Sequence, residues 1–177
     1  MMRFIVAALL GLAIPAQVQA VPAVPGADGF DFQYGDWKVH HRAKRPSGEW
    51  YEFEGDCNDR PILGGLGNVE DNIFYKPEGV TRGVALRTFD PKTGEWAIWW
   101  VDGRNPHGAL DPAMKGRFVD GVGTFYADGL YNGRQTRTRF IWSRITKTSA
   151  RWEQALSYDA GKTWDTNWVM DFTRKTG

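Results

Sequence analysis

Residues 164–174 read WDTNWVMDFTR, and this short stretch decides the fold class. Every second position is aromatic, apolar or small, and the positions between are mostly acidic or polar. Successive side chains of a β-strand point to opposite faces of a sheet, so a period of two is typical of a strand with one apolar face. The apolar set is Trp164, Thr166, Trp168, Met170 and Phe172, facing away from Asp165, Asn167 and Asp171.

The same alternation recurs along the chain, with turn signals between the segments. Residues 90–94, DPKTG, combine proline and glycine, and residues 131–134, YNGR, carry the Asn-Gly pair of a tight hairpin. No long segment has a helical period, apart from one turn at 30–34. We therefore predict an all-β fold, a single antiparallel up-and-down barrel of about ten strands. The other predicted strands span residues 37–45, 49–58, 68–74, 81–90, 95–102, 114–119, 123–131, 135–145 and 150–158.

Each predicted strand can be assigned an inner face from its apolar residues. The segment 49–58 is ambiguous, and we place Phe53 inward. In 81–90 we expect Val84, Leu86 and Thr88 inward, with Arg87 outward. The remaining inward sets are Trp37, Val39 and His41; Trp96, Ile98 and Trp100; Thr138, Phe140 and Trp142; and Trp152, Gln154 and Leu156.

The first twenty residues have the features of a secretory signal peptide. Arg3 supplies the positive charge, residues 4–14 are apolar, Pro15 interrupts them, and small residues precede a cleavage site after Ala20. The apolar run is too short for a membrane anchor, so no integral membrane segment is expected after cleavage. We expect an exported protein, periplasmic or secreted, with a flexible linker at 21–29 and one barrel domain at 30–177.

Charge and cysteine content limit the partners and the stabilising chemistry. The chain of 177 residues has 22 basic and 21 acidic residues, and loss of Arg3 with the signal peptide balances them. Such a balance gives no electrostatic reason to expect nucleic acid as a partner. The single cysteine, Cys57, cannot form an internal disulfide, so the core alone must stabilise the domain.

Several segments together resemble a known family. The start of the domain, Gly35-Asp36-Trp37, and residues 60–68, 89–96, 116–118 and 151–155 are similar to a bacterial secreted domain family of unknown function with a lipocalin-like, or calycin, β-barrel. The resemblance covers nearly all of residues 30–174. It implies the barrel fold and implies no particular reaction.

Residues 157–164, SYDAGKTW, match the Asp-box pattern Ser-x-Asp-x-Gly-x-Thr-Trp. We interpret the match as a turn in which the Asp carboxylate accepts backbone N–H groups and the glycine takes a positive φ. A glycosidase would also need a pair of carboxylates across a cleft, which one Asp box does not supply.

Metal and cofactor chemistry find no support in the sequence. His40 and His41 are adjacent on a predicted strand, so they point to opposite faces and cannot share a metal ion. The glycine-rich residues 64–67 lack the helix and Lys-Ser/Thr of a phosphate-binding loop. They form either a lid over the barrel mouth or a packed connection. We expect no cofactor and no metal.

The inner faces supply the candidate site. The nine tryptophans divide into Trp37 at the start of the barrel, Trp164 in the Asp-box turn, Trp99 on an outer face and a set that lines the interior. We expect the barrel to bind a small apolar or aromatic molecule, with His41 and Gln154 orienting its polar end. The candidate ligand-binding residues are His41, Trp100, Asp102, Trp142, Trp152, Gln154 and Trp168.

Two other functions remain open at this point. One is an enzyme that uses His41 as an acid or base in the same pocket. The other is a non-catalytic interaction protein with a filled barrel, in which the apolar outer residues Ala97, Trp99 and Val101 meet a partner or form a homodimer. We favour binding over catalysis, because no catalytic constellation is present.

Overall fold

The fold was analysed in a computed structural model that describes residues 23–131 and 133–176. The signal peptide predicted at 1–20 lies outside the described residues, as does Asn132 of the Asn-Gly turn. Ten strands and two single 3-10 turns make up the described chain. They are η1 (Asp31–Gln33), β1 (Gly35–Lys44), β2 (Trp50–Ile62), η2 (Leu63–Gly65), β3 (Gly67–Lys76), β4 (Gly79–Asp90), β5 (Glu95–Asp102), β6 (Met114–Val119), β7 (Val122–Tyr131), β8 (Arg134–Ser143), β9 (Ser149–Ser157) and β10 (Asp165–Arg174).

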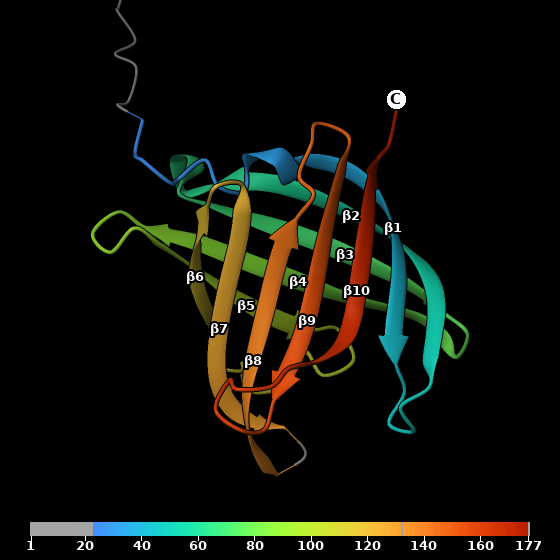
Figure 1. Ribbon diagram of the computed structural model, residues 1–177. Coiled ribbons are helices and arrows are strands. Elements are labelled where there is room, and N and C mark those ends of the chain that lie inside the picture. The colour runs from blue at the N-terminus through green and yellow to red at the C-terminus, as the bar shows by residue number, and fades with distance from the viewer. Residues whose placement is uncertain (1–22, 132, 177) are drawn as a thin grey trace, which may run out of the picture.

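Each strand pairs antiparallel with its neighbours in sequence, and β1 also pairs with β10, so the sheet closes on itself (Figure 1). The closing register places Trp37 opposite Arg174 and His41 opposite Met170. Every strand therefore has a partner on both sides, and the shortest pairing, with three residue pairs, joins β5 to β6. The prediction of an all-β, lipocalin-like up-and-down barrel is confirmed.

The N-terminal segment closes one end of the barrel, where Figure 1 shows the blue chain crossing the strand ends. Phe30 is fully buried, with its ring 5.0 Å from that of Trp96 and 4.9 Å from that of Phe118. Residues 24–29, within the expected linker, also contact this end: the Gly26 carbonyl accepts a hydrogen bond from Trp96 Nε1 at 2.9 Å. A Cβ on Gly29 would lie 2.6 Å from the Phe118 ring. We call this the closed end.

The other end carries the turns between β1 and β2, β3 and β4, β7 and β8, and β9 and β10, together with the β5–β6 loop. We call it the open end. The glycine-rich residues 64–67 lie between β2 and β3 and therefore at the closed end, where Leu66 packs against the core.

Strand β2 has the expected orientation, and it is longer than predicted. Phe53 and Cys57 are buried, which confirms that Phe53 faces inward. The strand continues to Ile62, and this extension brings Asp59 into the interior, where its residue is 2% exposed.

The face assignment of β4 was wrong. Ala85, Arg87 and Phe89 are buried and lie opposite the inward residues of β5, whereas the residues expected inside, Val84, Leu86 and Thr88, are half-buried on the outer face. Both faces of this strand carry apolar residues, so alternation does not distinguish them. The charge of Arg87 is tolerated inside because buried carboxylates pair with it.

The first part of β10 was also assigned to the wrong face. The register shifts between Thr166 and Trp168. Thr166 therefore lies opposite Ala155, which faces outward, and Trp168 lies opposite Gln154, which faces inward. An extra residue in one strand is a β-bulge, and it reverses the facing of all residues before it. Thr166 is therefore outward, and Trp164 precedes the strand and stacks on Arg139 outside the barrel.

The closed end should contribute a large share of the stability. We expect Phe30→Ala to lower the free energy of unfolding by about 3–5 kcal/mol, because a buried aromatic ring is lost from a packed cluster. Urea unfolding followed by tryptophan fluorescence measures the change. Val119→Ala, at a position of the same end that is 59% exposed, should change stability by less than about 0.5 kcal/mol. Equal effects of the two variants would contradict a packed closed end.

Candidate ligand cavity

The barrel contains a cavity of about 330 Å³ that reaches the open end. Residues of the β5–β6 loop and of the β7–β8 hairpin form its rim, including Asp111, Asp128 and Tyr131. Its walls are mainly aromatic and aliphatic, and they come from strands far apart in sequence. The principal wall residues are Trp100, Phe140, Trp152, Leu156, Trp168 and Met170.

The cavity occupies only part of the interior, because side chains of β1 and β2 fill the rest. His41 stacks on Phe53 with ring centroids 4.5 Å apart and an angle of 5° between the planes. Phe74 and Trp168 pack against this pair and also line the cavity, so they form the wall between the filled and empty halves. The Lys76 ammonium lies 5.5 Å from the Phe74 ring and does not line the cavity.

Five of the seven candidate binding residues line the cavity: Trp100, Trp142, Trp152, Gln154 and Trp168. Gln154 is held in place by a hydrogen bond of 3.1 Å from its Nε2 to Asn167 Oδ1. Thr166 faces outward and Trp168 faces inward because of the β-bulge at Asn167. The hydrogen bond between Gln154 and Asn167 therefore connects the bulge to the cavity wall.

His41 and Asp102 lie elsewhere. His41 is 1% exposed, and its Nδ1 accepts a hydrogen bond of 3.2 Å from Trp168 Nε1, so Trp168 separates it from the cavity. Burial in this aromatic surrounding lowers the pKa of His41 to about 3. The Asp102 carboxylate accepts hydrogen bonds from the Arg104 guanidinium near the open end, with Nε 2.9 Å from Oδ1.

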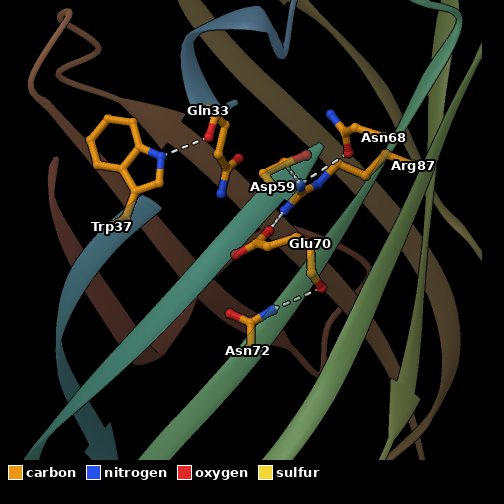
Figure 2. A network of polar contacts seen from close by, with 7 residues as sticks. All are labelled: Gln33, Trp37, Asp59, Asn68, Glu70, Asn72 and Arg87. Carbon is orange, nitrogen blue, oxygen red and sulfur yellow. Dashed lines mark hydrogen bonds and ion pairs between the residues drawn. The ribbon is translucent and has the colours of Figure 1, made fainter. Parts of the chain in front are cut away.

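The floor of the cavity is polar, which the strand faces assigned from the sequence did not predict. Glu70, Asn72 and Arg87 line it, and the Arg87 guanidinium is the centre of a buried network (Figure 2). Its Nη1 donates to Asp59 Oδ2 at 2.8 Å and to Asn68 Oδ1 at 3.2 Å, and its Nη2 donates to Glu70 Oε2. The inward assignment of Val84, Leu86 and Thr88 concealed this group, because it placed Arg87 outside.

A sequence signal for the floor does exist. Asn68, Glu70 and Asn72 alternate with Val69, Asp71 and Ile73, which is a polar row at a strand period. In the barrel, Asn68 lies opposite Arg87 and Glu70 lies opposite Asp59. A polar row on one strand beside an arginine on the next indicates an internal ion cluster, once the register is known.

The network carries an excess of negative charge. Two buried carboxylates, Asp59 and Glu70, share one guanidinium, and burial raises the pKa of Asp59 to about 6. The Arg87 guanidinium also lies 5.6 Å from the Trp142 ring. Polar atoms without a partner among the described residues gather around it; they are Asp59 Oδ1, Asn68 Nδ2, Arg87 Nε, Trp142 Nε1 and both amide atoms of Gln33.

Residues 157–164 form a turn on the outside of the barrel, away from the cavity. Asp159 Oδ1 accepts hydrogen bonds from the backbone N–H groups of Lys162 and Thr163, at 3.1 and 2.9 Å, and Gly161 has a φ of +92°. These hydrogen bonds, with those from the Ser157 and Thr163 hydroxyls, lower the pKa of Asp159. These hydrogen bonds therefore stabilise the turn, and none of residues 157–164 lines the cavity.

In the part of the chain that the structure describes, no helix has the length and apolar character needed to cross a membrane. Across residues 23–131 and 133–176, no three His, Cys, Asp or Glu side chains lie together in a way that would hold a metal ion.

The fold and its internal cavity define a lipocalin-like barrel, and two solved structures share it. The S-type phycobiliprotein lyase CPES from Guillardia theta is 9% identical, with a TM-score of 0.56, over 84% of this chain and 91% of that one. Rv2717c from M. tuberculosis is 10% identical, with a TM-score of 0.57, over 86% of this chain and 98% of that one. At such identities the similarity concerns the fold. No protein-family model and no curated protein matches the sequence.

The buried, neutral His41 should make the barrel sensitive to acid. Its pKa falls from 6.5 to about 3 on folding, so the unfolded chain binds the proton more tightly and folding stability decreases as pH falls below about 6.5. We expect wild type to lose about 1.4 kcal/mol per pH unit relative to His41→Phe between about pH 6 and pH 4. The lost Trp168 hydrogen bond lowers the stability of the variant by an amount that does not depend on pH.

Urea unfolding of both proteins at pH 7, 6, 5 and 4 measures the difference. Parallel stability curves for wild type and His41→Phe would show that His41 binds its proton equally well in the folded and unfolded chain.

Proposed function

We propose that this protein binds a small, largely aromatic or apolar molecule inside its barrel. The observation that carries the proposal is the cavity of about 330 Å³ with aromatic walls that reaches the open end. Ligand sites are typically concave, mostly apolar and supplied with a few polar groups that fix orientation. Here Gln154 supplies such a group on the wall, and Glu70, Asn72 and Arg87 supply it on the floor.

The alternatives from the sequence receive less support. A filled barrel is incompatible with the cavity, since at the open end side chains occupy only the β1–β2 side. An enzyme based on His41 would need that imidazole to reach the substrate, but Trp168 lies between them, and the lowered pKa of His41 makes its imidazole a weak base. The outer residues Ala97, Trp99 and Val101 are half-buried, and Trp99 lies opposite Leu86, so this face offers a partner little free apolar surface.

A matched pair of variants tests the binding site. Ala127→Phe places a ring inside the cavity, whereas Ala97→Phe makes the same change on the outer face of β5. We expect naphthalene, followed by quenching of tryptophan fluorescence, to bind wild type and Ala97→Phe equally and Ala127→Phe at least tenfold more weakly. Unchanged affinity in Ala127→Phe would exclude this cavity as the site.

We also propose that the barrel is exported, on the strength of the charged, apolar and small-residue pattern of residues 1–20. The expected outcome is a mature chain that begins at Val21, which mass spectrometry of the protein from its producing cells would measure. A mature chain that retains residues 1–20 would contradict export by cleavage.

A further inference from the structure

We propose that the molecule bound in the cavity is an organic cation, an amine or quaternary ammonium with an aromatic or alkyl body, whose charged end lies on the floor beside Glu70. This inference rests on the proposed function and specifies its ligand class. The inference adds a charge to the ligand, whereas the shape and apolar walls of the cavity alone would select a neutral molecule.

The first support is the charge of the lining. The charged residues that line the cavity are Glu70 on the floor, Asp111 at the rim and a single base, Arg87. Asp128 also borders the rim, but its carboxylate lies on the outer face of β7 and pairs with Arg137 at 3.8 Å. The guanidinium of Arg87 is already engaged by Asp59 and Glu70, so it is not free to receive an anion. An anionic ligand would pass the Asp111 carboxylate at the rim and meet Glu70 at the floor, whereas a cation is attracted at both places.

The second support is the unbalanced charge of the floor. Asp59 and Glu70 lie directly opposite each other on neighbouring strands, which is unfavourable for two like charges unless a counter-charge lies between them. One guanidinium neutralises one carboxylate. Either a proton or a second cation must offset the other, since an unpaired charge in a buried site is costly.

The geometry of Glu70 shows where the second cation would bind. Arg87 donates to Oε2, and among the residues that the structure describes Oε1 accepts no hydrogen bond. Figure 2 shows this second oxygen directed away from Arg87. Because Glu70 lines the cavity, a ligand cation can approach it there without displacing the guanidinium.

The third support is the aromatic wall. A cation within about 6 Å of an aromatic ring is attracted by the negative face of the ring, most strongly in a site that excludes water. The rings of this barrel already receive cations in this way: the Arg87 guanidinium lies 5.6 Å from the Trp142 ring, and the Lys76 ammonium lies 5.8 Å from that of Trp168. Both rings also line the cavity, together with Trp100 and Trp152.

A pair of ligands of the same shape tests the inference in the wild-type protein. Benzyltrimethylammonium and neopentylbenzene have the same heavy-atom arrangement and differ in one positive charge. We expect the cation to bind at least tenfold more tightly at pH 7.5, measured by titration calorimetry, and the anion 3-phenylpropionate to bind more weakly than either. Equal or tighter binding of neopentylbenzene would overturn the inference and leave the proposed function intact.

Two variants locate the charge. Glu70→Gln keeps the size of the side chain and removes the floor carboxylate, so it should remove most of the preference for the cation over neopentylbenzene. Asp71→Asn removes one negative charge from the next residue, on the exposed outer face, and should keep the preference. A preference that persists in Glu70→Gln would overturn the floor site.

If Glu70→Gln does not fold, the relative affinities of the cation, the neutral probe and the anion for the wild-type protein still test the inference. If naphthalene and all three charged and neutral probes fail to bind wild type, both the proposed function and this inference are excluded.

Discussion

The interior of this barrel is organised around one buried guanidinium. Arg87 lies between the aromatic cluster of the closed end and the cavity of the open end: its guanidinium is 4.7 Å from the Phe30 ring, and the same side chain lines the cavity floor. It also keeps Asp59 and Glu70 apart, two carboxylates that face each other across β2 and β3. A charge at this depth is stable only with such partners, so the three side chains must be present together.

This arrangement explains why the barrel is packed at one end and hollow at the other. On the closed side, η1 and the preceding residues supply Phe30, whose ring fills the space between Trp96, Phe118 and Trp142. On the open side, β1 and β2 supply His41 and Phe53, which fill their half of the barrel. The strands opposite contribute small inward residues, Ala127, Gly129 and Thr138, so the remaining half stays empty. The cavity is thus a result of side-chain size around the barrel, with a polar floor where the packed region ends.

The sequence predicted the strands well and their faces less well. All ten strands were expected within a few residues, because strand formation depends on local alternation and on turns such as 90–94. The inward assignment of Val84, Leu86 and Thr88 failed because both faces of β4 are apolar, and the choice between them depends on the ion partners of Arg87 on β2 and β3. The inward assignment of Thr166 failed because the bulge at Asn167 reverses the alternation, and a bulge has no period of its own.

The sequence likewise predicted only part of the candidate site. The aromatic wall residues Trp100, Trp142, Trp152 and Trp168 were placed inside from alternation, although both faces of β5 are apolar and the alternation of β10 breaks just before Trp168. His41 was correctly expected to be inward, but alternation does not show that Trp168 lies between it and the cavity. The floor was missed because Asp59, Glu70 and Arg87 belong to three strands whose side chains meet only when the register of the barrel is set.

The sequence by itself therefore determined the class of fold and the aromatic character of the interior, because both follow from the local period of two. Only the tertiary structure decided which residues meet, where the interior is empty, and that a buried ion cluster forms the cavity floor. The physical reason is that strand pairing joins residues that are far apart in the sequence, such as Glu70 with Asp59, 11 positions away, and Trp37 with Arg174, 137 positions away. Charge pairing and cavity shape depend on those distant neighbours, and no local pattern contains them.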